Sequence, residues 1–237
     1  MIKRFNTKLI TPKHVAIIMD GNNRWTKKHK LKGFKGHEKG LESIQNAVDS
    51  AKLFNIKFLT LFSFSSENWS RPKKEVDFLM TLLRRYLSDK INRLMEDNIS
   101  IKMIGNKEKL PRDIVKKINN YEKLTSKNKS LSLIFALNYG SRNEISTAVK
   151  KIIDKFVKKK FHVNEKAISL NLFTKNIPDP DLLIRTSGEK RLSNFLLWQL
   201  AYTELVFLDV LWPDFKKKHF VDALNQYSKR KRRYGCR

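Results

Sequence analysis

The stretch "HVAIIMDGNNRWTKK", residues 14–28, joins a short apolar run to a polar turn that begins at Asp20. The apolar part, residues 14–19, is rich in strand-forming residues and too short for a buried helix, so it predicts a buried strand. Arg24, Trp25 and two lysines follow the carboxylate within a few positions. In open parallel sheets, ligands bind beyond the carboxyl ends of the strands, and we therefore examine this turn as part of a site.

Apolar runs of the same kind recur along the chain, with helical patterns between most of them. The predicted strands are 14–19, 57–64, 100–105, 131–137, 181–185 and 204–208, and the predicted helices are 41–51, 73–96, 111–125, 142–159, 193–201 and 215–232. Such alternation is typical of a mostly parallel sheet with helices on both faces. The 237 residues, 41% of them hydrophobic, therefore predict a single α/β domain, residues 1–237, with a central, mostly parallel six-stranded sheet.

The composition is strongly basic, with a formal net charge of +27. Such a balance attracts polyanions, namely nucleic acid, anionic lipid or phosphorylated small molecules, although a lysine-rich solvated surface is the more common explanation. The lone cysteine, Cys236, excludes a disulfide framework within one chain. The chain lacks a signal peptide pattern and any apolar run of about 20 residues, so we expect a cytoplasmic protein, with peripheral association at the inner face of the membrane as an option.

Polar clusters follow four of the predicted strands. They are DGNNR (20–24), SSENWSR (65–71), NYGSR (138–142) and TSGEKRLSN (186–194), and Arg185 directly precedes the last one. Arginine occurs in or beside each cluster, and its planar fork of donors suits phosphate oxygens. Each turn alone could be an ordinary helix cap. Four of them at one sheet edge favour a site for more than one phosphate group.

The carboxylate of Asp20 would repel phosphate in such a rim unless a divalent cation lay between them. Mg²⁺ is bound in this way, by one or two carboxylates together with substrate phosphates and water. Glu204, which opens the last apolar run, is a candidate second ligand, with a surface ion pair as the alternative. His37 could contact an anion at a helix start or act as a cap.

The predicted helix 73–96 has a wider apolar face than one sheet contact requires. Its apolar residues include Phe78, Leu79, Met80, Leu82, Leu83, Tyr86 and Leu87. This face either packs in the core or lines an apolar tunnel, and the sequence leaves both interpretations open.

Several long motifs together carry a resemblance. They are HVAIIMDGNNRW, the GH at 36–37, FSSENWSRP, NYGSR, PDPDLLIRTSGE and RLSNFLLWQLAYTEL followed by WPDF. In this order, over residues 13 to 235, they resemble the cis-prenyltransferase family and are most similar to the bacterial undecaprenyl diphosphate synthases. The resemblance implies a homodimeric, Mg²⁺-dependent enzyme that condenses isopentenyl diphosphate onto farnesyl diphosphate. Its product would be undecaprenyl diphosphate, the precursor of the lipid carrier for cell-wall glycan (peptidoglycan) synthesis, delivered to the membrane, with no specific nucleic-acid partner.

The resemblance also implies roles for individual residues. Asp20 would be the essential acid and, with Glu204, the magnesium ligand, while Asn68 would be catalytic by orienting substrate or passing a proton to a phosphate oxygen. The residues implied at the allylic diphosphate are Gly21, Asn22, Arg24 and His37; those of the loop that closes over the substrates are Ser65, Ser66, Glu67, Asn68, Trp69 and Arg71; those at isopentenyl diphosphate are Arg185, Arg191 and Ser193. Further substrate-binding candidates are Asn23, Trp25, Gly33 and Leu192. Arg233-Tyr234-Gly235 resembles an Arg-x-Gly element that reaches a neighbouring subunit's site.

Three positions depart from the usual family pattern. Asn23 replaces the second glycine of Asp-Gly-Asn-Gly-Arg-Trp, and Asn tolerates left-handed backbone angles better than most residues. Gly33 stands where the family usually has an arginine, for which Lys32 or Lys35 would compensate. Lys190 stands where a histidine is common, and a cation there is compatible with phosphate binding.

A basic nucleic-acid-binding protein is the rival prediction, supported by the charge and by YSKRKRRYGCR at residues 227–237. No RNA-recognition motif, zinc finger or KH-type GXXG loop accompanies this charge. A second rival is a non-catalytic partner subunit of the same family, against which Asp20, Asn68 and Arg71 argue. The sequence also leaves open a cis-prenyltransferase with a different product length.

Overall fold

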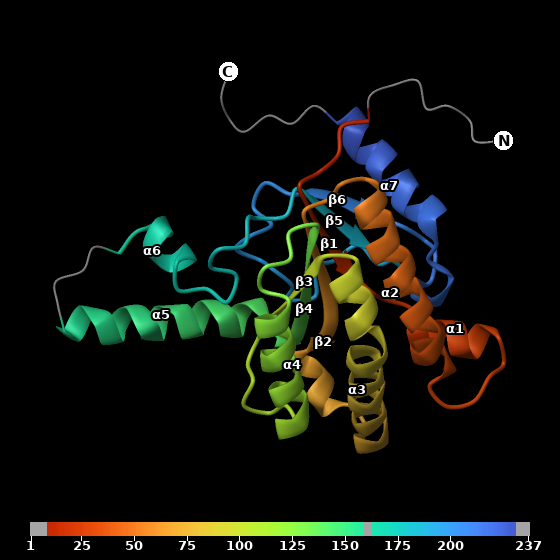
Figure 1. Ribbon diagram of the computed structural model, residues 1–237, viewed down its shortest axis with the longest axis horizontal. Helices are drawn as coiled ribbons and strands as arrows, with labels where there is room; N and C mark the ends of the chain where they lie inside the picture. The colour runs from red at the N-terminus through yellow and green to blue at the C-terminus, as the bar shows by residue number, and fades with distance from the viewer. Residues whose placement is uncertain (1–8, 159–162, 231–237) are drawn as a thin grey trace.

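The computed structural model describes residues 9–158 and 163–230, which form an α/β domain around one six-stranded sheet (Figure 1). The strand order is β3-β4-β2-β1-β5-β6, and every neighbouring pair is parallel. The strands are β1 His14–Ile18, β2 Phe58–Ser65, β3 Ile99–Ile104, β4 Leu131–Tyr139, β5 Leu182–Arg185 and β6 Glu204–Phe207. The predicted fold is confirmed, with a sheet that is parallel throughout rather than mostly parallel.

Strand β1 lies at the centre of the sheet, between β2 and β5. Val15 and Ile17 enter the larger core cluster, and Ala16 and Ile18 enter the smaller one. Successive side chains of a strand point to opposite faces, so β1 is apolar from Val15 to Ile18 because both of its faces are covered. The register pairs Ile18 with Arg185 of β5, which brings the residues that follow both strands to one edge.

Seven α-helices and two 3₁₀ helices occur in the described residues. They are α1 Asn22–Lys28, α2 Lys35–Leu53, α3 Lys73–Glu96, α4 Arg112–Leu124, α5 Ser141–Lys158, α6 Glu165–Ser169, α7 Lys217–Lys229, η1 Ser66–Ser70 and η2 Trp212–Asp214. The larger core cluster joins the sheet to α2, α3, α4 and α7, which therefore share one face. Helix α5 extends away from the sheet, with α6 beside it (Figure 1). None of the helices in the described ranges carries an apolar stretch long enough to cross a bilayer.

The other face of the sheet is covered mainly by turns between residues 171 and 202, so the prediction of helices on both faces was wrong in this part. The predicted helix 193–201 does not form, because Ser193, Asn194 and Leu196 have φ angles of 49°, 61° and 47°, which are left-handed. The segment is instead fixed by tertiary contacts. The ring of Phe195 stacks on Phe62 with centroids 4.3 Å apart, and the Asn194 carbonyl accepts a 2.8 Å hydrogen bond from the Ser141 amide.

A buried carboxylate ties this covering segment to the sheet. Glu144, on α5, is 0% exposed and accepts hydrogen bonds from the Tyr139 hydroxyl (2.5 Å), the Gln199 amide (3.0 Å) and the Thr174 backbone amide (3.2 Å). Burial, followed by the adjacent charge of Glu144, raises the pKa of Tyr139, which keeps its hydroxyl protonated as a donor. Three donors make this buried acid a structural anchor.

His14 opens the central strand as a buried, neutral histidine. Its Nδ1 lies 2.7 Å from the Pro178 carbonyl oxygen and its Nε2 lies 2.8 Å from Thr60 Oγ1. Burial lowers the pKa of His14 to about 4, against the opposing effects of the Pro178 hydrogen bond and the Asp181 charge. Protonation of the ring therefore disfavours the folded chain.

This pKa difference predicts a loss of stability in acid. An unfolded His14 binds a proton below its ordinary pKa of 6.5, whereas the folded chain resists it down to about 4, so stability is lost as the pH falls through this window. The contribution is about 2 kcal/mol between pH 7 and pH 5. Urea unfolding at pH 7 and at pH 5 measures this loss. Between these pH values the free energy of unfolding should fall by about 2 kcal/mol less in His14→Gln than in the parent. The matched variant His29→Gln, at an exposed histidine, should keep the parental sensitivity; equal sensitivity in all three proteins would contradict the assignment.

Candidate active site

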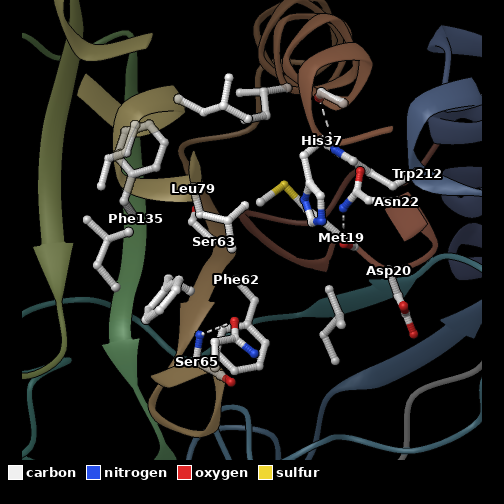
Figure 2. A pocket seen from close by; sticks show the side chains of 18 of the residues that line it. Met19, Asp20, Asn22, His37, Phe62, Ser63, Ser65, Leu79, Phe135 and Trp212 are labelled. Atoms are coloured by element: carbon white, nitrogen blue, oxygen red, sulfur yellow. Dashed lines mark hydrogen bonds between the residues drawn. The ribbon is translucent and has the colours of Figure 1, made fainter. Parts of the chain in front are cut away.

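A cavity of about 650 Å³ lies between the sheet and helices α2 and α3 (Figure 2). In Figure 2, Asp20, Asn22 and His37 lie on one side of the cavity and Leu79 and Phe135 on the other. The polar lining is Asp20, Asn22, His37, Ser63, Ser65, Glu67, Asn68, Arg71, Arg185, Arg191, Ser193 and Asn194. The apolar lining includes Ile18, Met19, Leu41, Ile44, Phe62, Phe64, Leu79, Met80, Leu82, Leu83, Tyr86, Phe135, Leu137 and Trp212. One cavity thus combines a charged part with an apolar part.

Asp20 reaches the cavity through a tight turn directly after β1. Gly21 has a φ of 110°, and a Cβ atom there would lie 2.9 Å from Leu211 Cδ2, so both the angle and the space require glycine. The Thr186 hydroxyl lies 2.9 Å from the Asp20 amide nitrogen and 2.7 Å from its carbonyl oxygen. The backbone of Asp20 is therefore held from the neighbouring strand end while its carboxylate faces the cavity.

Two arginines surround the Asp20 carboxylate. Arg185 Nη2 donates to Asp20 Oδ2 at 2.8 Å, and Arg24 Nη2 lies 3.5 Å from the same oxygen. Burial alone would raise the pKa of Asp20, but the hydrogen bond and charge of Arg185, and then Ser187 and Arg24, hold it below its usual value. Asp20 is therefore ionised.

Arg185 itself is only 3% exposed and is held by the turn that follows β5. Its Nη1 donates to Ser193 Oγ at 2.8 Å and also to the Arg191 carbonyl. Its Nε is buried and has no hydrogen-bond partner among the described residues. The guanidinium thus presents a fixed positive charge beside the cavity.

Segment 65–71 forms the short helix η1 and closes one side of the cavity. Asn68 Oδ1 accepts a 3.1 Å hydrogen bond from the Ser65 amide, and Asn194 Nδ2 donates to Glu67 Oε1 at 2.8 Å. Burial works against ionisation of Glu67, but the Asn194 hydrogen bond and those of neighbouring groups lower its pKa. Trp69 points into the core, where its Nε1 donates to Asn138 Oδ1 at 2.8 Å.

Glu75 links the segments that frame the cavity mouth, although the sequence did not single it out. Its carboxylate is largely buried, and Oε1 accepts from Arg71 Nη1 at 2.8 Å and from Asn23 Nδ2 at 3.4 Å. His37 Nε2 lies 3.7 Å from the same oxygen. Burial lowers the pKa of His37 to about 4, with Glu75 opposing the change and Arg71 adding to it, so the ring is neutral. One sequence signal could have pointed to Glu75: it lies four residues after Arg71, in the first turn of the predicted helix 73–96.

Ten of the predicted site residues line the cavity, and most of the others lie around it. The lining residues are Asp20, Asn22, His37, Ser65, Glu67, Asn68, Arg71, Arg185, Arg191 and Ser193. Gly21, Asn23, Arg24, Ser66 and Trp69 support them through the turn, η1 and the contacts of their neighbours. Trp25 is directed to η2, where its Nε1 donates to Asp214 Oδ1 at 2.9 Å. Leu192 lines a second cleft of about 270 Å³ together with Arg142.

The predicted departures have simple structural outcomes. Asn23 lies inside α1 and has no left-handed angle, so the backbone does not require glycine there. Gly33 has a φ of 68° and open space around it, outside the cavity lining. Lys35 pairs with Glu38 at 2.8 Å.

Glu204 does not meet Asp20 within one chain, so the prediction that these two acids share a metal ion is wrong for a single chain. Glu204 is the first residue of β6 and pairs in register with Leu182, at the opposite end of the sheet from Asp20. Its Oε2 instead accepts from Arg230 Nη1 at 2.6 Å. The Arg233-Tyr234-Gly235 element and Cys236 lie outside the described residues.

Asp20 fits the role of one protein ligand of a magnesium ion. It is ionised, faces the cavity and lies beside groups suited to phosphate, whose oxygens together with water would complete a coordination shell. Within the described ranges, no group of three or more His, Cys, Asp or Glu side chains forms a metal cage.

Comparisons with known proteins agree with this geometry. The family model described as putative undecaprenyl diphosphate synthase matches residues 18–235. The chain belongs to the cis-prenyltransferase family. It is 48% identical over 225 residues to an isoprenyl transferase of Thermotoga maritima, covering 94% of this chain and 97% of that one, and 46% identical over 227 residues to that of Bacillus subtilis, covering 94% and 88%.

Solved structures show the same fold for this cis-prenyltransferase. Lavandulyl diphosphate synthase from Lavandula x intermedia, in complex with dimethylallyl diphosphate, superposes with a TM-score of 0.92 at 38% identity, covering 95% of this chain and 99% of that one. A probable undecaprenyl diphosphate synthase from Campylobacter jejuni gives 0.81 at 34% identity, covering 96% and 100%. The chain is therefore a prenyltransferase of isoprenoid biosynthesis, in a family whose members make different products.

Removing the Glu75 carboxylate should loosen the cavity mouth. We expect Glu75→Ala to lower the free energy of unfolding by about 1–3 kcal/mol, because Arg71 and Asn23 lose the largely buried carboxylate that accepts their hydrogen bonds. The matched variant Glu42→Ala, at an exposed acid paired with Lys39, should change it by less than about 0.5 kcal/mol. Urea denaturation measures both, and equal effects of the two substitutions would show that Glu75 does not link these segments.

Proposed function

We propose that this cis-prenyltransferase condenses isopentenyl diphosphate repeatedly onto farnesyl diphosphate, with cis double bonds, to give undecaprenyl diphosphate, the lipid-carrier precursor for cell-wall glycan synthesis. The observation that carries this proposal is a cavity that combines an arginine-lined mouth with an apolar interior. A prenyl diphosphate has the same two parts, an anionic head and an apolar chain. A cavity of this size falls within the usual range for small-molecule sites.

The allylic diphosphate is proposed to bind at the start of α1 and α2. Asn22, His37 and Arg71 line the cavity there. Around them lie Gly21 before α1, Gly33 in the turn before α2, and the α1 residues Asn23, Arg24 and Trp25. The Arg71 guanidinium would donate two hydrogen bonds to phosphate. To do so, it would have to leave its hydrogen bond with Glu75 and turn to the ligand. The pKa of His37 is depressed by burial, so its ring would donate one neutral hydrogen bond.

Isopentenyl diphosphate is proposed to bind at the turn after β5. Arg185, Arg191 and Ser193 converge on this part of the cavity, next to Asp20. Leu192 lies between two of these residues and fixes the turn against the smaller core cluster. The segment with Ser65, Ser66, Glu67 and Trp69 would cover both substrates and exclude water.

In the reaction, the C–O bond of the allylic diphosphate breaks and its carbon bonds to the alkene of isopentenyl diphosphate. The isopentenyl carbon next to the resulting cationic centre then loses a proton. We assign a phosphate oxygen as the acceptor of this proton, because the amide of Asn68 is a very weak base. Asn68 would orient the alkene, and Arg185 would stabilise negative charge. A magnesium ion held by Asp20 would supply a Lewis acid for the departing diphosphate.

The growing chain is proposed to enter the apolar part of the cavity. Each buried CH₂ group contributes roughly 0.8 kcal/mol, which favours further elongation while space remains. Leu79, Met80 and Leu83 of α3 line this part, whereas Phe78 packs on Phe34 outside it. A product with so much apolar surface would then be delivered to a membrane, and we place the enzyme in the cytoplasm with peripheral contact at the inner membrane face.

We also propose a homodimer in which α5 contributes to the interface. Helix α5 extends from the body of the domain and exposes Val149 (42%) and Ile153 (54%) (Figure 1). Leu197 (38%) and Tyr202 (73%) are further exposed apolar residues of the covering segment. Exposed apolar residues of this kind favour a partner surface, and a second copy of the chain is the simplest one.

The direct test is to incubate the protein with farnesyl diphosphate, isopentenyl diphosphate and magnesium. Mass spectrometry should find polyprenyl diphosphates separated by single five-carbon units, and released diphosphate should match the number of condensations. Absence of any condensation product would contradict the proposal.

Asp20→Ala should lower the turnover by roughly 10²–10³-fold or more, because the substrate diphosphates lose the group that we assign to the metal. Circular dichroism should show that the domain still folds, because the core clusters are untouched, although the turns that the Asp20–Arg185 pair holds are expected to loosen. The matched variant Asp222→Ala, at an exposed acid on α7, should keep the parental rate. Substantial activity in Asp20→Ala would refute the metal role.

Chelation offers a second check on the same role. Excess EDTA should stop product formation, and added Mg²⁺ should restore it, because the described residues hold no metal cage independent of the substrate. The same titration with the Asp20→Ala variant should show no recovery. Full activity in EDTA would contradict a magnesium-dependent reaction.

A further inference from the structure

The strands begin at the edge of the sheet opposite the candidate active site, and four segments lie side by side there. They are 10–13 before β1, 53–57 before β2, 95–98 before β3 and 123–130 before β4, and we call this surface the strand-start edge. The Lys57 amide donates to the Lys13 carbonyl at 3.0 Å, and the Ser132 amide donates to the Lys57 carbonyl at 2.8 Å. The Ser130 amide donates to the Asn98 carbonyl at 2.9 Å. The four segments therefore form one continuous surface.

Each of the three helices that lead into this edge carries an exposed apolar side chain in its last turn. The exposed apolar residues of the edge are Leu53 (59%) at the end of α2, Met95 (40%) near the end of α3, Leu124 (53%) at the end of α4, and Ile10 (55%) before β1. Single exposed apolar side chains are ordinary on a protein surface. Four of them on one edge form a patch of the kind that marks an interaction site.

Lysines accompany these apolar side chains. They are Lys13, Lys57, Lys123, Lys127 and Lys129, and all five are exposed. Among the residues that the structure describes, none of the five forms an ion pair. The four segments contain two acids in sequence, Glu96 and Asp97, and Asp97 pairs with Lys52 of α2 at 2.5 Å. The edge therefore has an excess of positive charge next to its apolar patch.

Acidic residues bound this charged surface on the far side of β1. Asp179 and Asp181 precede β5, the next strand of the sheet. Asp181 Oδ2 accepts hydrogen bonds from the amides of Lys13 and His14 at 2.8 and 3.0 Å. The lysines and the exposed apolar residues are thus confined to the part of the edge where β3, β4, β2 and β1 begin.

Helix α3 runs from the candidate active site to this edge. Glu75 of its first turn lies at the cavity mouth, Tyr86 lines the apolar part of the cavity, and Met95 lies at the edge. The nine residues from Tyr86 to Met95 span roughly 14 Å of helix. The apolar part of the cavity therefore lies on the side of the strand-start edge, whereas the charged mouth lies at the opposite side of the sheet.

We propose that the strand-start edge is the surface by which this enzyme docks on an anionic lipid bilayer. The lysines lie at the negatively charged headgroups, and the four exposed apolar side chains insert between the lipids. The cavity mouth then faces water, from which soluble diphosphates arrive. Nucleic acid fits this surface less well, because the exposed apolar side chains are not aromatic and offer no ring on which a base could stack. The inference rests on the membrane contact in the proposed function and names the surface that makes it.

Co-sedimentation of the full chain with vesicles tests the charged part of the surface. Vesicles of equal parts phosphatidylglycerol and phosphatidylcholine should bind the parent, and vesicles of phosphatidylcholine alone should bind it far more weakly. The double variant Lys127→Glu/Lys129→Glu should lower the partition coefficient on the anionic vesicles by about 10-fold or more, because two cations next to the headgroups are reversed.

A charge-matched variant separates this surface from general attraction by a basic protein. Lys27→Glu/Lys28→Glu makes the same change of charge at exposed residues of α1, beside the start of α2 and far from the strand-start edge. Because this distance exceeds the screening length of about 10 Å, the partition coefficient should fall by less than about threefold. Equal losses in the two double variants would overturn the proposal.

A fluorescent label tests the apolar part and the orientation of the enzyme. In a Cys236→Ser background, Leu124→Cys and Leu31→Cys each offer one exposed thiol, the second in the turn between α1 and α2. A nitrobenzoxadiazole label at position 124 should shift its emission to the blue on anionic vesicles and be quenched by nitroxide-labelled acyl chains. The label at position 31 should keep the emission that it has in water. Absence of the shift at position 124, or an equal shift at both positions, would contradict docking by this edge.

Neither measurement needs a substrate, so its failure is distinct from failure of the proposed reaction. If the parent elongates isoprenoids but does not bind anionic vesicles, only the docking surface is overturned. If the parent docks through position 124 but forms no condensation product, the proposed reaction fails and the docking surface stands. The altered side chains in the described residues are exposed, so circular dichroism should show the parental fold in every variant.

Discussion

The ion pair between Asp20 and Arg185 is the interaction on which the site depends. The two residues come from adjacent parallel strands, β1 and β5, and meet at 2.8 Å where both strands end. A half-buried acid and a nearly buried base would each be costly alone, but each lowers the cost of the other. Arg24 and Ser193 then attach the following turns to this pair. The pair thus fixes two turns whose side chains line one cavity.

The parallel sheet explains why groups distant in the sequence converge. Strands that run in one direction place their carboxyl ends at one edge, so the segments after β1, β2 and β5 become neighbours. Helices α2 and α3 then cover the same face and enclose apolar space next to the polar edge. A polar head and an apolar chain can be held together because strand ends and helix faces meet there.

Much of this arrangement follows from the sequence, and the exceptions have physical causes. Buried parallel strands are continuous apolar runs, so their positions could be read with small errors. The residues after those strands came together as predicted, whereas Glu204 opens its strand and therefore lies at the other end of the sheet. Residues 193–201 have a helical pattern but left-handed backbone angles, which composition does not reveal. Glu75 was missed because its role depends on how α1, α2 and α3 are placed relative to one another.

The covering segment, made of the turns at residues 171–180 and 191–202 that flank β5, has a consequence for the order in which the molecule loses structure. Its turns are held by bonds to distant residues, such as Asn194 to Ser141 and Gln199 to Glu144, instead of by a repeating helical ladder. Such a segment opens cooperatively, because breaking one tether loosens the others. Ser193 and Arg191 belong to it and line the cavity, so the shape of the cavity depends on the integrity of this segment. The cavity can therefore lose its lining by a local event that leaves the helices on the opposite face, and the sheet itself, in place.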